Sequence, residues 1–127
     1  MNRLYLAGPM TGLPDYNYPA FFAAADALRQ TGYDVLNPAD IGQHPTWTWA
    51  DYMRVGLKTL TTQAEAVAVL PGWEHSTGAR LEVRTAQRRG LRVHTVSTWH
   101  TLAPFFLARQ FTWFGTTDAV YYAAGNE

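Results

Sequence analysis

The sequence predicts an α/β protein with a doubly wound parallel sheet, because short apolar runs alternate with longer amphipathic ones along the chain. Hydrophobic residues make up 47% of the 127 residues and charged residues 16%, which excludes an intrinsically disordered chain. We expect one domain over residues 1–127. Right-handed crossovers then give a sheet of four to five strands in the order 2-1-3-4(-5), with helices on both faces.

The expected strands are short apolar runs, and turn-forming residues follow the first three. They are residues 4–7, 34–36, 66–70 and 91–96. The run 66–70 (AVAVL) has no polar interruption, as expected for a strand that is covered on both faces. Residues 119–123 form a candidate edge strand.

The expected helices show apolar residues at helical spacing. They are residues 20–30, 49–62, 76–89 and 101–109. Ser76 is a good N-cap for the third helix, and Gly90 stops it. Gly32 stands where a glycine commonly ends a helix, just after the first one.

A doubly wound sheet binds its ligand beyond the carboxyl ends of the strands, where the winding direction reverses. Here that point is the crevice between the first and third strands, where residues 8–12 and 71–78 meet. Ser76 and the free amides of Thr77, Gly78 and Ala79 at a helix N-terminus predict an anion site. The alternative is that Ser76 only caps the helix and Gly78 only eases packing.

Glu82 is the candidate reactive group. It falls at the edge of the sheet-facing stripe made by Ala79, Val83 and Ala86, and no basic residue stands three or four positions away. A carboxylate held against small apolar residues near a helix N-terminus points to function. The alternative is a half-exposed helix glutamate.

Charge and composition exclude several classes of protein. Ten basic residues balance ten acidic ones, so we expect no nucleic-acid polymer as partner. Nine of the ten basic residues are Arg, which suits a small anionic ligand. The chain has no cysteine and no apolar run long enough to span a membrane, and we expect a cytoplasmic protein. The four histidines lack metal-ligand spacing, and His75 is the one expected near the site.

Two motifs carry a resemblance to a known family. Residues 5–12 (YLAGPMTG) and 71–82 (PGWEHSTGARLE) resemble an uncharacterised phage and bacterial domain family, which is similar to the nucleoside 2-deoxyribosyltransferase superfamily. The resemblance covers about residues 3–96. It implies a flavodoxin-like fold and an N-glycosidase or transferase that acts on (deoxy)nucleosides or their 5′-monophosphates.

The resemblance also implies roles for particular residues. Glu82 takes the nucleophile position, and the hydroxyl of Tyr5 lies beside it. Ser76 stands where transferases of free nucleosides carry an aspartate and where monophosphate-specific hydrolases carry a serine. Because a carboxylate would repel a phosphate and a hydroxyl can bind it, the implied substrate is a nucleoside 5′-monophosphate. The implied substrate-binding residues are Gly8, Pro9, Met10, Thr11, Gly12, Gly72, Trp73, Ser76, Gly78 and Ala79.

Two departures from the family pattern bear on turnover. Thr11 stands where the hydrolase branch has an arginine, and Gly56 stands where many relatives carry an acid that assists departure of the base. Asp51, about one turn earlier, is a candidate substitute for that acid. The implied retaining mechanism needs no metal and no cofactor. A nucleotide-binding or sensing module without turnover remains an alternative, and an FMN protein is weaker because the first loop lacks a Ser/Thr-rich phosphate cradle.

Aromatic residues make up 14% of the chain and gather in two places. Loop residues around the crevice could stack on a nucleobase: Tyr16, Tyr18, Trp47, Trp49 and Trp73. Ordinary packing is the alternative for any one of them. The second group lies towards the end of the sequence, mostly in the extension 110–127, and predicts the interface of a homodimer or higher homo-oligomer. Its members are Phe105, Phe106, Phe111, Trp113, Phe114, Tyr121 and Tyr122.

Overall fold

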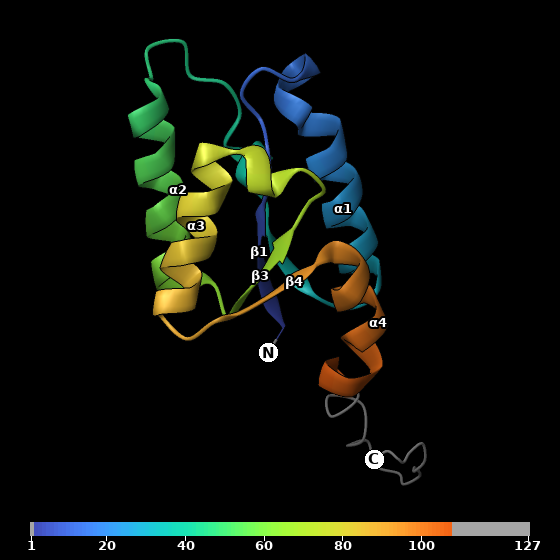
Figure 1. Ribbon diagram of the computed structural model, residues 1–127. Coiled ribbons are helices and arrows are strands. Elements are labelled where there is room, and N and C mark those ends of the chain that lie inside the picture. The colour runs from blue at the N-terminus through green and yellow to red at the C-terminus, as the bar shows by residue number, and fades with distance from the viewer. Residues whose placement is uncertain (1, 108–127) are drawn as a thin grey trace, which may run out of the picture.

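The protein is seen in a computed structural model that describes residues 2–107 (Figure 1). Its strands form one parallel sheet in the order β2-β1-β3-β4, which confirms the predicted order for the described residues. The strands are β1 (Arg3–Ala7), β2 (Asp34–Leu36), β3 (Ala66–Val69) and β4 (Arg92–Thr95). The structure is consistent with a flavodoxin-like fold, and the carboxyl ends of its strands lie at one edge of the sheet.

Helices cover both faces of this sheet, as Figure 1 shows. The long helices are α1 (Tyr18–Gln30), α2 (Trp49–Gln63), α3 (Thr77–Arg88) and α4 (Val96–Leu107). Helices α2 and α3 pack together on one face, and α1 and α4 pack together on the other. Three short 3-10 turns were not predicted: η1 (Pro14–Asn17), η2 (Pro38–Ile41) and η3 (Trp73–His75). Each turn follows the carboxyl end of a strand.

The central strand β1 sends alternate side chains to opposite layers, as the strand period requires. Leu4 and Leu6 are fully buried in the core shared with α1 and α4. Tyr5 and Ala7 are buried in the second core, under α2 and α3. This alternation places the ring of Tyr5 beneath the two helices that carry Gly56 and Glu82.

The end of the described chain differs from the sequence prediction. The last helix begins at Val96 instead of residue 101, because the hydroxyl of Thr95 accepts a hydrogen bond from Thr98 N at 3.1 Å and starts the helix earlier. The preceding strand therefore ends at Thr95. The candidate strand 119–123, the extension 110–127 and the aromatic residues from Phe111 onward lie outside the described residues. Within residues 2–107, no helix combines the length and apolar character needed to cross a bilayer.

Candidate active site

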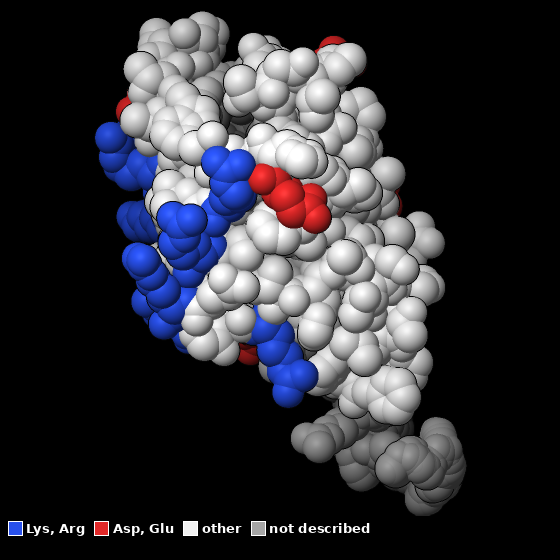
Figure 2. Space-filling model, in the orientation of Figure 1, with Lys and Arg blue, Asp and Glu red and all other residues white. Residues whose placement is uncertain are grey.

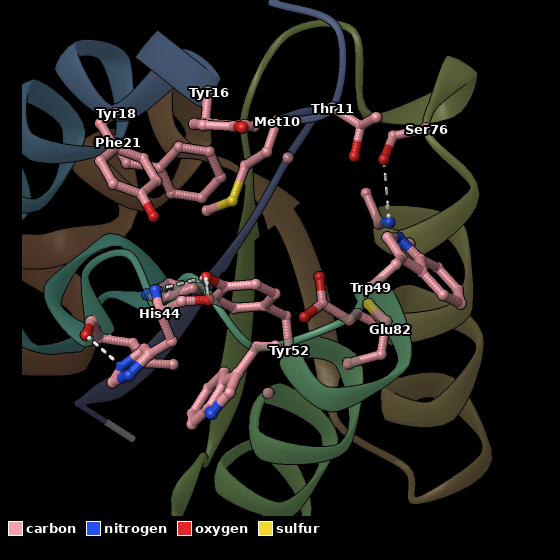
Figure 3. A pocket seen from close by; sticks show the side chains of 18 of the residues that line it. Met10, Thr11, Tyr16, Tyr18, Phe21, His44, Trp49, Tyr52, Ser76 and Glu82 are labelled. Carbon is pink, nitrogen blue, oxygen red and sulfur yellow. Dashed lines mark hydrogen bonds between the residues drawn. The ribbon is translucent and has the colours of Figure 1, made fainter.

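A cavity of about 370 Å³ opens where β1 and β3 end (Figure 3). Its volume falls in the range of small-molecule sites. The walls come from the loop after β1, from η1 and α1, from the segment between β2 and α2, and from the first turns of α2 and α3. The predicted position of the site, beyond the carboxyl ends of the first and third strands, therefore coincides with this cavity.

Tyr5 and Glu82 meet in this cavity. The tyrosine hydroxyl donates a hydrogen bond of 2.5 Å to Glu82 Oε2. Glu82 is only 8% exposed, and burial raises the pKa of its carboxyl group to about 7, although the hydrogen bond from Tyr5 acts in the opposite direction. Burial and the neighbouring carboxylate raise the pKa of Tyr5 well above its ordinary value, so Tyr5 stays protonated and can donate. A buried carboxylate whose pKa lies near neutrality is typical of a catalytic group.

Gly56 lets α2 pass close to this pair. A Cβ atom at position 56 would lie 2.8 Å from Tyr5 Oη and 3.1 Å from Glu82 Oε2. The first of these distances is too short for any contact of a real Cβ, so a side chain here would displace the tyrosine hydroxyl. The acid that the resemblance implies at position 56 would need the space that Tyr5 and Glu82 occupy here.

The first predicted loop packs tightly against the end of β3. A Cβ at Gly8 would lie 2.9 Å from Leu70 Cβ, so only glycine allows the first loop to approach the end of β3 this closely. Gly8, Met10 and Thr11 line the cavity from this loop. Pro9 and Gly12 are not among the lining residues.

Ser76 caps α3 as predicted, because its Oγ accepts a hydrogen bond of 3.2 Å from Ala79 N. Ser76, Gly78 and Ala79 line the cavity, so the N-terminus of α3 faces it. Backbone amides and a hydroxyl at a helix N-terminus can hold an anion there. Of the other residues predicted in the second loop, Gly72 and Trp73 do not line the cavity, and Trp73 packs instead against the core beneath α2 and α3.

The structure does not bring Asp51 into the cavity. Its carboxylate accepts hydrogen bonds from the backbone N and the hydroxyl of Thr48, at 2.8 and 3.1 Å, in a capping box at the start of α2. It also pairs with Arg54 at 2.9 Å. The backbone hydrogen bond from Thr48 is the main reason why the pKa of Asp51 is lowered, so this carboxyl group is a poor proton donor.

Aromatic side chains form two of the cavity walls. Tyr16, Tyr18, Trp47 and Trp49 line the cavity, as predicted. Sequence reasoning missed Phe21, His44 and Tyr52, which also line it, and His75, which was expected near the site, does not. The spacing of Trp49, Tyr52, Met53 and Gly56 on one face of α2 was a signal for Tyr52 that the sequence offered.

The turn η1 holds Tyr16 at the rim of the cavity in an unusual backbone conformation. Asp15, Tyr16 and Asn17 all have positive φ angles, of 52°, 53° and 60°, which are uncommon for residues other than glycine. Asn17 Nδ2 donates a 3.0 Å hydrogen bond to the carbonyl of Pro9 and ties this turn to the first loop. The Tyr16 side chain is half exposed and lies at the cavity rim.

Cationic side chains lie outside this cavity. In Figure 2, Lys and Arg gather on the side of the molecule formed by α2 and α3. The exposed cations of these helices are Arg54, Lys58, Arg80, Arg84 and Arg88. No lysine or arginine of the described residues lines the cavity. An anionic ligand group would therefore depend on hydroxyls and backbone amides.

Residues 2–95 match the family described as "Domain of unknown function (DUF4406)". The match includes both loops and the residues of the cavity. No curated protein matches the sequence.

Proposed function

The chain belongs to the DUF4406 family, and we propose that it cleaves, or transfers at, the N-glycosidic bond of a nucleoside or deoxynucleoside 5′-monophosphate, with Glu82 as nucleophile. The observation that carries this proposal is the buried pair of Tyr5 and Glu82 in a cavity whose volume falls in the range of small-molecule sites. The motifs that resemble nucleoside 2-deoxyribosyltransferases supply the same two residues.

The chemistry follows that of retaining glycosidases. The ionised Glu82 attacks C1′ of the sugar while the bond from C1′ to the base nitrogen breaks. The base leaves with the electron pair of that bond and takes up a proton from solvent. Water or a second base then attacks C1′ of the glycosyl ester, gives up a proton to solvent and releases Glu82 as the carboxylate, with overall retention of configuration. A pKa of about 7 leaves a large share of Glu82 ionised at neutral pH.

The phosphate group would lie at the N-terminus of α3. Ser76 stands six residues before Glu82, and six residues of helix rise about 9 Å. A phosphate bound at Ser76 would therefore lie well apart from the anomeric carbon that Glu82 attacks. The hydroxyl of Ser76 and the amides near Gly78 and Ala79 can donate to phosphate oxygens. An aspartate at position 76 would repel the phosphate, so serine supports a monophosphate substrate.

A nucleotide-binding module without turnover is the second candidate. Gly56 carries no acid, and the Asp51 carboxylate is held by Thr48 and Arg54 outside the cavity. Neither residue can therefore protonate a departing base in this arrangement. This second candidate predicts tight binding of a monophosphate without release of its base.

Base release from a panel of ribo- and deoxyribonucleoside 5′-monophosphates tests both candidates. Chromatography should detect free base with the natural protein and none above background with Glu82→Gln. Glu74→Gln is a matched control, because Glu74 is exposed and does not line the cavity. Equal release by Glu82→Gln would remove Glu82 as nucleophile. Binding without release by the natural protein would favour the module without turnover.

A further inference from the structure

The side of the cavity formed by the segment between β2 and α2 is built from stacked rings (Figure 3). His44 and Trp47 stack with ring centroids 3.9 Å apart and an interplanar angle of 13°. Trp47 packs edge-on against Tyr52 at 5.0 Å. These three residues hold one another in place, so this wall is preorganised.

A second aromatic wall comes from η1 and α1. Tyr16, Tyr18 and Phe21 line the cavity on this side together with Met10. The rings of Tyr16 and Tyr18 lie 6.1 Å apart. In Figure 3 these side chains lie across the cavity from His44 and Tyr52, while Ser76 and Thr11 occupy another side. If Glu82 attacks C1′ and the phosphate lies near Ser76, the base must extend between these two walls.

Several polar atoms of the two walls are hydrogen-bonded within the protein. The hydroxyl of Tyr52 accepts a hydrogen bond from His44 N at 2.7 Å and donates one to His44 O at 3.2 Å. His44 Nε2 lies 3.1 Å from the carbonyl of Ile41, so it is the donor there. Tyr18 Oη donates to the carbonyl of Gly42 at 3.5 Å. These contacts hold the walls in place and engage three groups that could otherwise read a base: the hydroxyls of Tyr18 and Tyr52, and His44 Nε2.

The side chains that commonly read base edges are missing from the cavity. Asn, Gln, Asp, Arg and Lys are absent from its lining within residues 2–107. The carboxylate in the lining, Glu82, accepts a hydrogen bond from Tyr5. A site that recognises a hydrogen-bonding edge strongly rejects a ligand without it, because its own polar groups are then left unpaired. This cavity lacks such a set of groups.

We infer that the base subsite selects a planar ring by stacking and apolar contact and does not read its hydrogen-bonding edge. The substrates are then 5′-monophosphates of several bases, including planar bases that have no hydrogen-bonding edge. This inference rests on the proposed function and adds the rule by which that site chooses its substrate. Stacking tolerates any base because every base has a π face.

A binding titration tests this rule without depending on turnover. The protein is the Glu82→Gln variant, whose neutral amide resembles the protonated acid and prevents reaction. The ligands are the four natural deoxynucleoside 5′-monophosphates, the 5′-monophosphate of 5-nitroindole deoxyriboside, and deoxyribose 5-phosphate. 5-Nitroindole is planar and lacks a base-pairing edge. The measurement is calorimetry, with the ribose series run in parallel.

The expected result is that all five nucleotides bind within roughly tenfold of one another, and at least tenfold more tightly than the sugar phosphate. Binding of the nitroindole nucleotide more than a hundredfold weaker than that of the best natural one overturns the inference but leaves the proposed function standing. The same holds if one natural base is preferred by that factor. If neither the nucleotides nor the sugar phosphate bind, the proposed function falls, and the inference with it.

Two variants separate stacking from hydrogen bonding. In the same Glu82→Gln background, Trp47→Ala should weaken the binding of every nucleotide by a similar factor, roughly tenfold or more. The affinity for the sugar phosphate should not change. Tyr16→Phe removes a hydroxyl at the rim and keeps the ring, so the ranking of bases should not change. If Tyr16→Phe gains or loses a preference for one base over another, this hydroxyl reads the base and the inference is wrong.

Discussion

Tyr5 and Glu82 stand 77 residues apart in the sequence, yet the tyrosine hydroxyl donates a 2.5 Å hydrogen bond to Glu82 Oε2. One residue comes from the central strand and the other from α3. Burial disfavours the ionised form of Glu82, whereas the hydrogen bond from Tyr5 favours it. The balance between these two effects places the ionisation of Glu82 near neutral pH.

Stability should fall as pH rises from about 4.5 to about 7. The pKa of Glu82 is about 7 in the folded protein against an ordinary value of 4.5, so the folded state holds a proton that the unfolded state has lost. The stabilisation is complete below pH 4.5 and disappears as pH passes 7, and its size is roughly 3 kcal/mol. Urea unfolding of the natural protein and of Glu82→Gln at pH 5 and pH 8 measures it. Relative to the natural protein, Glu82→Gln should have a higher free energy of unfolding at pH 8 than at pH 5. If the difference in free energy of unfolding between the two proteins is the same at both pH values, the assignment is wrong.

Tyr5→Phe should move the acid limb of the rate profile to higher pH. Its hydroxyl lowers the pKa of Glu82, so its removal raises that pKa and leaves less ionised nucleophile at pH 7. The loss of kcat/KM should therefore shrink as pH is raised. Tyr33→Phe is a matched control, because Tyr33 is also buried but donates to the carbonyl of Trp99, in the core shared with α1 and α4. An unshifted acid limb in Tyr5→Phe would show that Tyr5 does not act on the ionisation of Glu82.

The fold could be predicted because its main signals are local or topological. Apolar runs such as residues 66–70 identify buried strands, and the handedness of crossovers leaves few strand orders. The boundary at Thr95 was missed because the side-chain cap that starts α4 overrides the apolar pattern of the preceding residues. Element ends depend on such single contacts, whereas element types depend on whole segments.

The site was predictable where one residue carries its own signal. Glu82 stands out on an apolar stripe, and Ser76 has the chemistry of an N-cap. His44 was missed because it lies in a loop and its backbone contact with the Tyr52 hydroxyl leaves no periodic pattern. Tyr52 was missed although its spacing on α2 places it on the same helix face as Trp49 and Gly56. Asp51 could have been reassigned from sequence, since Thr48 and Asp51 have the spacing of a capping box.

Gly56→Ala should lower activity although alanine is the better helix former. The gain in helix propensity is about 1 kcal/mol, but the new Cβ would lie 2.8 Å from Tyr5 Oη and push the hydroxyl away from Glu82. We expect base release to fall roughly tenfold or more, as for other losses of an aligned catalytic hydrogen bond. Lys58→Ala, on the exposed side of α2, serves as control.

Gly56→Asp should reduce base release further, although it introduces the acid that the resemblance to nucleoside 2-deoxyribosyltransferases implies at this position. A longer side chain needs the space that Tyr5 Oη and Glu82 Oε2 already occupy. Base-release rates of the two Gly56 variants, compared at equal folded fraction by circular dichroism, measure the effect. A rate for Gly56→Asp above that of the natural protein would show that the chain accommodates the missing acid and that the packing argument is wrong.

Ser76→Asp should reduce the preference for a phosphorylated substrate without unfolding the protein. Aspartate is as good an N-cap as serine, so its carboxylate can still accept the hydrogen bond from Ala79 N. The new negative charge repels a phosphate at the N-terminus of α3 and can instead accept a hydrogen bond from a free 5′-hydroxyl. We expect KM for the monophosphate to rise roughly tenfold or more, while KM for the matching nucleoside stays the same or falls. Ser97→Asp, an exposed substitution on α4, controls for the added charge. If the ratio of the two KM values is unchanged in Ser76→Asp, the phosphate does not bind at the N-terminus of α3.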